Sequence, residues 1–283
     1  MLIARTVAEL RQHLKGFDKP ALVPTMGHLH EGHLALLRLA KPLGDVTVAS
    51  IFVNRLQFLP HEDFASYPRN FESDCEKLRD VGCDVLFAPD DSVMYPQPQT
   101  FKVQPDPTLA DVLEGAFRPG FFTGVCTVVL KLFHCVFGGQ AGVAVFGQKD
   151  FQQQLILRHM VTQFDLPITM VTGPTSRAAD GLALSSRNSY LSPSERAEAV
   201  QLSLALEGLA TWARSQAGQG LVDVAAAEAQ AMDRLRSRGW HPDYLTLRHR
   251  DDLSSVNEVR DQPLIVLGAA KLGTTRLIDN LLV

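Results

Sequence analysis

Short apolar runs rich in branched residues alternate with stretches of helical periodicity along the first two thirds of the chain. The apolar runs lie at 21–27, 45–53, 83–89, 141–147 and 167–173. Such runs are typical of strands that are buried on both faces of a sheet. The intervening segments predict helices at 31–42, 70–81, 123–137 and 150–163, the last with Asp150 as its N-cap. Because strand and helix alternate, the pattern predicts a doubly wound parallel sheet.

The hydrophobic pattern changes in the last third of the chain. Residues 192–195 read Ser-Pro-Ser-Glu, the capping-box arrangement that begins a helix, which we expect to run to about Ser215. The segment "QAGQG" follows as a linker. The remaining pattern predicts a helix at 221–238 and two strands at 243–249 and 263–273. These elements are expected to form a smaller α/β domain.

Length and composition set the expected number of domains and the class of partner. A chain of 283 residues lies where one domain tends to split into two. We expect a Rossmann-like domain at 1–175 and a smaller C-terminal α/β lid domain at 176–283. The net charge of −4 gives no general attraction for nucleic acid or an anionic membrane. Small molecules are therefore the expected partners.

The chain carries no recognisable membrane or secretion signal. No apolar run reaches ~18 residues, and residues 1–17 predict a short amphipathic helix without a small-residue cleavage site. A cytoplasmic location is expected. The four cysteines are too far apart for a Cys-x-x-Cys metal knuckle and too few for a secreted disulfide scaffold, so we expect reduced and mostly buried thiols.

The stretch "PTMGHLHEGHLALL", residues 24–37, joins the first buried strand to a helix. Pro24 is expected to end the strand ladder, and Gly27 permits a tight turn into a helix that begins near His30. In an open parallel sheet such a turn lies at the carboxyl edge, where ligands bind. The N-terminus of the incoming helix attracts phosphate.

His30 and His33 lie three residues apart on the first helical turn and are expected to point the same way. Gly32 lies between them and removes a side chain that would block a close approach. Two imidazoles beside this gap could donate hydrogen bonds to a polyphosphate and to charge that develops on it in a transition state. The alternatives are a buried, satisfied histidine pair or an adventitious metal site. The position directly after a strand favours phosphate binding.

This stretch closely resembles the signature of the pantoate:β-alanine ligase family, the pantothenate synthetases of the nucleotidyltransferase superfamily. Further segments resemble the same family in the same order: "SIFVNRLQF" at 50–58, "YPRNFESDCEKL" at 67–78, "LEGAFRPGFFTGVCTVVLKLF" at 113–133, "VFGQKDFQQ" at 145–153, "PTSRAADGLALSSRNSYLS" at 174–192 and "GTTRLIDN" at 273–280. The resemblance implies that pantoate and ATP form pantoyl adenylate and pyrophosphate. β-Alanine then attacks the adenylate to give pantothenate and AMP.

Two further segments carry groups suited to phosphate. Lys149 follows the strand at 141–147 and could place an ammonium against a phosphate, although a solvated surface lysine is the alternative. Residues 185–187, Ser-Ser-Arg, offer two hydroxyls and a guanidinium, although serine is also common in turns. The resemblance implies these catalytic residues: His30, His33, Lys149, Ser185, Ser186 and Arg187. It implies these further ATP contacts: Pro24, Thr25, Met26, Gly27, Gly32, Gly147 and Asp150.

The expected substrate and metal contacts lie at the ends of neighbouring strands and on the helices that follow. Asn54 and Gln57 follow the strand at 45–53, and Gln153 follows Lys149 by one helical turn. The resemblance implies that Gln57 and Gln153 hold the hydroxyls and carboxylate of pantoate. It also places Tyr67 and Arg118 at the pocket mouth or against a neighbouring subunit, where either could equally be structural, and it implies a homodimer.

Asp74 and Asp150 are candidates to hold Mg²⁺, directly or through water, because magnesium favours a few carboxylates together with phosphate oxygens. The remaining candidate metal ligands, the histidines, are assigned to phosphate instead. We therefore expect ATP and Mg²⁺ to bind together.

The chain departs from the family pattern at a few positions. Arg55 stands where the family usually has proline, which we expect to loosen the segment that carries Gln57 and to add a cation near an anionic substrate. His28, Gln148 and Ser176 also differ from the common residues. Two other functions stay open: another small-molecule adenylyltransferase, and a catalytically idle homologue. The C-terminal domain argues against the first, and the retained phosphate-binding residues argue against the second.

Overall fold

The computed structural model describes residues 1–60, 62, 64–218, 221–259 and 262–283. The chain divides into two compact units, the first made of residues 1–148 and 153–174 and the second of residues 149–152 and 175–283. The short insert 149–152 belongs to the second unit, which the sequence did not suggest. Part of the predicted linker, residues 219 and 220, lies outside the described residues.

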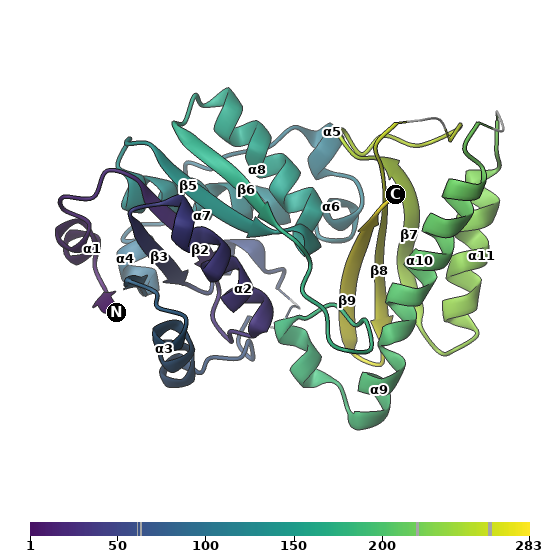
Figure 1. Ribbon diagram of the computed structural model, residues 1–283, viewed down its shortest axis with the longest axis horizontal. Coiled ribbons are helices and arrows are strands. Elements are labelled where there is room, and N and C mark those ends of the chain that lie inside the picture. Colours follow the sequence, from purple (N-terminus) through teal and green to yellow (C-terminus); the bar gives the residue numbers. More distant parts are fainter. Residues whose placement is uncertain (61, 63, 219–220, 260–261) are drawn as a thin grey trace. The chain divides into compact units, whose positions relative to one another are not determined.

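The first unit is built on a six-stranded sheet in which every recorded pairing is parallel (Figure 1). Its strands are β1 (Leu2–Ala4), β2 (Pro20–Thr25), β3 (Val46–Ile51), β4 (Val85–Phe87), β5 (Gly142–Gly147) and β6 (Ile168–Gly173). Their order is β1-β4-β3-β2-β5-β6. The order therefore runs outward from β2 in one direction and from β5 in the other. Ligands of open parallel sheets bind at the carboxyl edge beside such a reversal, and the predicted doubly wound sheet is confirmed.

Helices cover both faces of this sheet. Its helices are α1 (Val7–His13), α2 (Glu31–Ala40), α3 (Phe71–Asp80), α4 (Asp91–Met94), α5 (Pro107–Ala110), α6 (Glu114–Phe117), α7 (Phe121–Phe137) and α8 (Phe151–Gln163), which begins in the insert. Alternate residues of a strand face opposite sides. Val23 of β2 accordingly packs with Leu37 of α2 and Leu78 of α3. α7 packs against β2 and α1, and Figure 1 shows α2 in front of the sheet and α7 behind it.

The predicted N-terminal helix is confirmed at Val7–His13, but a strand that was not predicted precedes it. Residues Leu2–Ala4 form β1, which pairs in parallel with β4, and α1 begins only after Thr6. Three apolar residues carry too little pattern to distinguish a strand from a helix. The pairing partner, 83 residues further along the chain, decides the conformation.

The prediction that Pro24 ends its strand was also wrong. Pro24 lies within β2 and pairs with Ser50 of β3. The backbone oxygen of Thr25 accepts a hydrogen bond from Phe52 of the β3 side. Because backbone groups alternate along a strand, the nitrogen of Pro24 faces β5 instead, and the recorded pairing with β5 stops at Leu22. A proline is tolerated where its side of the ladder has ended.

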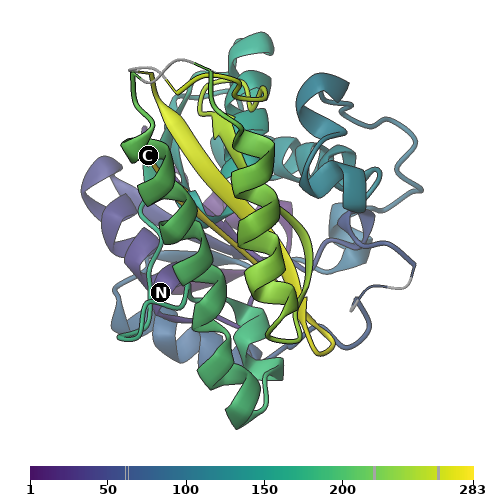
Figure 2. The same ribbon diagram turned by 90° about the vertical axis from the view of Figure 1, so that its right-hand side faces the viewer.

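The second unit contains an antiparallel sheet of three strands, β7 (His241–His249), β8 (Leu264–Leu272) and β9 (Thr275–Leu282). Helices α10 (Val200–Ser215) and α11 (Val224–Arg236) lie side by side on one face of it (Figure 2). The predicted capping box is confirmed, since Ser192 and Glu195 start α9 (Pro193–Glu198), and the expected long helix is divided at Ala199. β9 was not predicted, because Asp and Asn are depleted in strands.

Two expectations from composition concern the whole chain. All four cysteines are free thiols, and Cys75, Cys83 and Cys126 are buried, as predicted. Burial raises the pKa of the Cys83 thiol to about 11. Over the ranges that the structure describes, none of the helices has the length and apolar character needed to span a bilayer.

Candidate active site

The two histidines of the turn after β2 form the cap of α2. His30 is the N-cap, and its Nδ1 accepts a hydrogen bond from the Gly32 backbone N–H at 3.1 Å. The Nδ1 of His33 accepts from the His30 backbone N–H at 3.3 Å. The ring centroids lie 4.1 Å apart. The structure therefore brings His30 and His33 together, as the spacing predicted.

These cap bonds determine which ring nitrogen carries the proton. A neutral imidazole has one acceptor nitrogen and one N–H donor. Because Nδ1 of both His30 and His33 accepts a backbone N–H, the ring proton of each lies on Nε2. Nε2 lies on the far side of the ring from the cap contact. Each histidine thus directs an N–H donor away from its own backbone, as a phosphate contact requires.

A buried carboxylate holds the chain that enters this turn. Gly27 and His28 both have left-handed backbone angles, φ 83° and φ 50°. Asp74 of α3 is 1% exposed, and its two oxygens accept the backbone N–H groups of His28 at 2.8 Å and Leu29 at 2.7 Å. A Cβ at Gly27 would lie 3.1 Å from the Asp74 carboxylate. Asp74 therefore positions the turn, and its predicted role as a metal ligand stays a prediction.

Asn54 and Gln57 lie at the end of β3 and are joined by their side chains. Asn54 donates from Nδ2 to Gln57 Oε1 at 3.0 Å and to the Gly124 backbone oxygen at 3.2 Å. Its Oδ1 accepts from the Leu56 N–H at 3.4 Å and from the Tyr95 hydroxyl at 2.6 Å. These contacts use both donors and both lone pairs of the amide. Asn54 is therefore a buried residue that orients Gln57, whose Nε2 contacts Met26 Sδ at 3.2 Å.

Arg55, where we expected a proline from the family resemblance, contacts Asp91 and the ring of Tyr95. One of its terminal nitrogens lies 3.8 Å from the Asp91 carboxylate, and its guanidinium lies 5.4 Å from the centre of the Tyr95 ring. Burial raises the pKa of the Tyr95 hydroxyl, with a smaller contribution from Asp91, so this hydroxyl stays protonated and donates to Asn54. The added cation is thus paired within the protein. Its contacts tether the segment that we expected it to loosen.

Tyr67 and Arg118 make contacts that stabilise the same region. The guanidinium of Arg118 donates to both carboxylate oxygens of Glu62, at 2.6 and 2.8 Å, and to the Gln57 backbone oxygen at 3.1 Å. Tyr67 is 6% exposed and packs edge-on against Phe58. These are structural contacts. Direct substrate contacts by either residue stay predictions.

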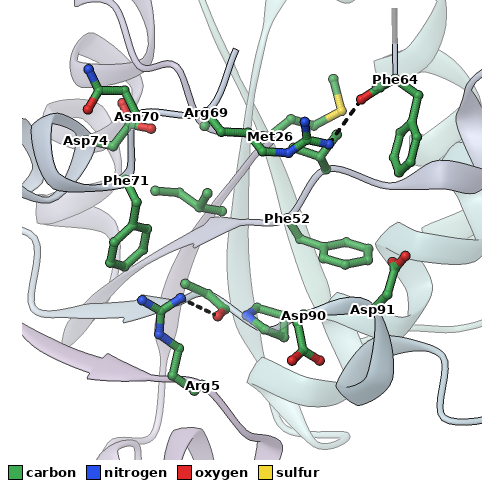
Figure 3. Close-up of a pocket in the computed structure, with 15 residues that line it drawn as sticks. Arg5, Met26, Phe52, Phe64, Arg69, Asn70, Phe71, Asp74, Asp90 and Asp91 are labelled. Atoms are coloured by element: carbon green, nitrogen blue, oxygen red, sulfur yellow. Dashed lines mark hydrogen bonds between the residues drawn. The ribbon is translucent and has the colours of Figure 1, made fainter. Parts of the chain in front are cut away.

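A cavity of about 340 Å³ opens at the carboxyl ends of the strands, next to Met26 and Gly27 (Figure 3). Arg5 stacks on the Phe71 ring at 4.0 Å, and Arg69 extends toward Met26. The other lining residues include three aromatic and acidic side chains that sequence reasoning did not connect with the site: Phe52, Asp90 and Asp91. The size and mixed lining suit a small polar molecule.

The candidate residues of the second unit lie in two short turns. Lys149 and Asp150 belong to the 3₁₀ turn η3 (Gln148–Asp150) directly after β5, with Lys149 Nζ 3.8 Å from Asp150 Oδ1. The Lys149 side chain is 18% exposed, which disfavours the solvated-lysine alternative, whereas Asp150 is 47% exposed. α8 begins at Phe151, and Gln153 lies in its first turn, half-buried.

Ser185 caps the 3₁₀ turn η4 (Ser186–Tyr190) by accepting the Arg187 N–H at 3.3 Å. Residues 185–187 are half-buried. Among the residues that the structure describes, the buried Oδ1 of Asn188 has no hydrogen-bond partner. We refer to Lys149 and residues 185–187, which we expected to bind phosphate, as the phosphate clamp.

The described part of the chain holds no group of three or more His, Cys, Asp or Glu side chains arranged to bind a metal ion. Magnesium keeps waters and substrate phosphates as ligands and needs only one or two carboxylates from the protein. The half-exposed Asp150 fits that requirement. Asp74, with a backbone N–H on each oxygen, fits it less well.

The chain is similar to known proteins of one family over nearly its whole length. The family model for pantoate-beta-alanine ligase matches residues 2–282. The chain is 64% identical to the pantothenate synthetase of Verminephrobacter eiseniae and 60% identical to that of Paracidovorax citrulli, in each case over 99% of both chains.

Solved structures of the same kind of enzyme superimpose on the chain. Pantothenate synthetase from Thermus thermophilus has a TM-score of 0.90 at 43% identity, over 99% of both chains. The ligase from Francisella tularensis, crystallised with beta-gamma ATP and beta-alanine, has a TM-score of 0.79 at 30% identity, over 100% of this chain and 97% of that one. The alternatives of another adenylyltransferase and of an idle homologue are not favoured. The chain belongs to the pantoate-beta-alanine ligase family.

Proposed function

We propose that the chain joins pantoate to β-alanine in two steps through a pantoyl adenylate. In the first step a carboxylate oxygen of pantoate bonds to the α-phosphorus of ATP, and the bond from that phosphorus to the bridging oxygen breaks. Pyrophosphate leaves with the electron pair. In the second step the β-alanine amine bonds to the acyl carbon and the bond from that carbon to the phosphate oxygen breaks. AMP leaves with the electron pair, and the amine proton passes to water. The first step needs two anions to be aligned and neutralised more than it needs a strong acid or base.

The observation that carries this proposal is the position of two turns at the reversal of strand order. The turn with His30 and His33 follows β2, and the turn with Lys149 follows β5. β2 and β5 are the neighbouring strands between which the order reverses. Nucleotides bind at such a position in open parallel sheets.

We assign the phosphates of ATP to the turn and to the phosphate clamp together. The Nε2–H groups of His30 and His33 donate to phosphate oxygens and to the charge that develops on them. Lys149 and Arg187 supply full positive charge, and Ser185 and Ser186 supply hydroxyl donors. The remaining ATP contacts come from backbone and small residues at the strand ends: Pro24, Thr25, Met26, Gly27, Gly32, Gly147 and Asp150.

Gln57 and Gln153 are proposed to hold pantoate. Their neutral amides can donate to its carboxylate and accept from its hydroxyls. Gln57 is pre-oriented by Asn54, so it binds without first losing side-chain freedom. Asn54 itself acts through Gln57, since its own hydrogen-bonding groups are used within the protein.

Mg²⁺ is proposed to arrive with the triphosphate and to reach the protein through Asp150. It would neutralise charge on the leaving pyrophosphate. Asp150 lies beside Lys149, so a metal there would be close to the same phosphates. Asp74 continues to accept the backbone N–H groups of His28 and Leu29.

The remaining assignments rest on the family resemblance. We propose that the first unit binds nucleotide and pantoate, that the second serves as a lid, and that the protein is a cytoplasmic homodimer. Sedimentation equilibrium tests the last point, since a dimer has twice the 31.1 kDa mass of the chain. A mass equal to that of one chain at micromolar concentration would contradict the proposed homodimer.

One assay tests the reaction. The protein is mixed with ATP, Mg²⁺ and D-pantoate, pyrophosphate is followed, and β-alanine is then added while AMP is followed. Pyrophosphate that needs pantoate, and AMP that needs β-alanine, support the two-step ligase. Pyrophosphate release without pantoate would indicate a different transferase, and no release would indicate a protein without this activity.

A further inference from the structure

The segment 273–280, "GTTRLIDN", resembles the family but has no role in the reaction described above. It contributes two consecutive polar residues to β9, Asp279 and Asn280, which are only 4% and 2% exposed. Neighbouring residues of a strand point to opposite faces. The two side chains can therefore hold two different segments of the second unit.

Asp279 forms a two-point ion pair with Arg177. Its Oδ2 accepts from Arg177 Nη1 at 2.7 Å and its Oδ1 from Nη2 at 2.9 Å. The Asp279 side chain is 3% exposed. The Arg177 side chain is 26% exposed. Desolvating the Asp279 charge costs free energy that the mutual attraction offsets only in part, so the pair is weak evidence for a purely stabilising role. We therefore explain the pair by its effect on position: it holds Arg177 at a defined place beside β9.

Arg177 links Asp279 to the turn that leads into the serines of the clamp. Its backbone bridges Ala183 in a short antiparallel turn, and Nη1 also donates to the Gly181 oxygen at 3.0 Å. The turn closes when the Leu184 N–H donates to the Ser176 oxygen at 2.9 Å. Ser185 is the next residue. The Arg177 guanidinium therefore connects β9 to the turn that directly precedes Ser185.

Asn280 holds the other part of the clamp. Its Nδ2 donates to the backbone oxygen of Lys149 at 2.8 Å, across 131 residues of sequence. This contact lies within the second unit, to which the insert 149–152 belongs. It fixes the main chain from which the Lys149 ammonium extends.

We propose that Asp279 and Asn280 are positioning residues of the ATP site: from one strand they set the spacing between Lys149 and Ser185–Arg187. This inference rests on the proposed function, in which both segments bind the triphosphate. It adds a shared anchor for the clamp. The competing explanation is that the two residues only stabilise the second unit.

A matched ion pair in the same sheet separates the two explanations. Asp243 of β7 accepts from Arg276 Nε of β9 at 2.7 Å, with side chains 18% and 19% exposed. It joins strands of the same sheet and has no assigned role in the site. Asp243→Asn therefore reports the cost of losing an ion pair in this sheet.

The experiment compares Asp279→Asn, Asn280→Ala and Asp243→Asn by thermal unfolding and by steady-state kinetics with ATP and pantoate varied separately. Displacing reacting groups by about 1 Å can cost 100-fold, so kcat/KM for ATP should fall about tenfold to 100-fold in the first two variants. KM for pantoate should stay within about twofold. Asp243→Asn should lose thermal stability and keep its kinetic constants. If Asp279→Asn does not fold, Arg177→Lys keeps the charge and removes the two-point contact.

A double variant tests whether Asn280 acts through Lys149. If it does, Asn280→Ala should cost little in a Lys149→Ala background, because the group that it positions is gone. Equal costs in both backgrounds, or wild-type kinetics of Asn280→Ala and Asp279→Asn, would overturn the inference. A wild-type rate for Lys149→Ala would instead overturn the proposed function, so the two failures are distinguishable.

Discussion

The turn after β2 and the phosphate clamp are held in place by different means. The cap bonds of the turn join His30 to residues two and three positions away. Its distant supports include Asp74, 46 residues from His28, and Lys77, whose Nζ donates to the Leu29 backbone oxygen at 2.8 Å. The clamp is held by contacts across 102 and 131 residues, from Asp279 and Asn280. The histidine pair is therefore fixed by local cap bonds and the chain before it by α3, whereas the clamp depends on the last strand of the chain.

The two regions also present different chemistry to a phosphate. His30 and His33 are neutral donors whose direction is set by backbone hydrogen bonds. Lys149 and Arg187 carry full charge on long side chains, and a full charge attracts a phosphate over a greater distance than a neutral donor does. We infer that the turn provides alignment and the clamp provides neutralisation. The following substitutions test this division, beginning with the largest expected effect.

His33→Gln removes the directed donor and keeps the turn. Glutamine at this helix position can accept from the cap residue, as in a capping box, so the melting temperature should not change. The rate of pantoate-dependent pyrophosphate release should fall about 100- to 1,000-fold, the usual cost of one preorganised donor. His159→Gln, on the exposed side of α8, is the control. A near-wild-type rate would remove His33 from the mechanism.

Asp74→Asn weakens the support beneath the turn. One carboxylate oxygen becomes an amide that cannot accept a backbone N–H, so the free energy of unfolding should fall by about 1.5–3 kcal/mol. The maximal rate should fall about tenfold, because the histidines shift with the turn. Urea unfolding and steady-state kinetics measure the two effects, with the exposed Asp80→Asn of the same helix as control. Unchanged stability with a raised Mg²⁺ requirement would support the metal-ligand role instead.

Tyr95→Phe removes the hydroxyl that donates to Asn54. Gln57 should then be less well oriented, and KM for pantoate should rise about fivefold to tenfold, as expected for one buried hydrogen bond. KM for ATP should not change. In a Gln57→Ala background the same substitution should have little further effect. A change in KM for ATP alone would contradict the chain of contacts from Tyr95 to Gln57.

Arg55→Pro restores the common residue of the family and should have the smallest effect. Asn54 has φ −82° and ψ 107°, an extended conformation that a following proline accepts, and position 55 begins the 3₁₀ turn η2 (Arg55–Gln57), where proline is favoured. The substitution removes the half-exposed ion pair with Asp91, which contributes about 0–1 kcal/mol. KM for pantoate should stay within about twofold. A large decrease in KM would show that the Arg55 cation hinders pantoate binding.

The parallel sheet could be predicted because its strands are buried on both faces and read as apolar runs. The elements that were missed depend on distant partners. β1 has three residues and forms through β4, and β9 contains Asp279 and Asn280, which disfavour a strand until Arg177 and Lys149 pair with them. Pattern within a window of the sequence cannot contain such information.

In the site, too, features set by local sequence could be predicted and features set by distant partners could not. The histidine pair followed from a spacing of three residues and a preceding strand. The task of Asp74 in the turn and the full use of the Asn54 amide could not be deduced, because each depends on backbone groups brought close by the fold. Residue type alone indicated a metal ligand and a substrate contact for these two positions. The hydrogen-bond partners indicate positioning.

A crystal structure with a non-hydrolysable ATP analogue and Mg²⁺ tests the central claim most directly. We predict His33 Nε2, Lys149 Nζ and Ser186 Oγ within about 3 Å of oxygens of one triphosphate, with the Nδ1 of His33 still bonded to its cap. A triphosphate bound by the turn alone, with Lys149 and Ser186 facing other ligands or solvent, would contradict the account.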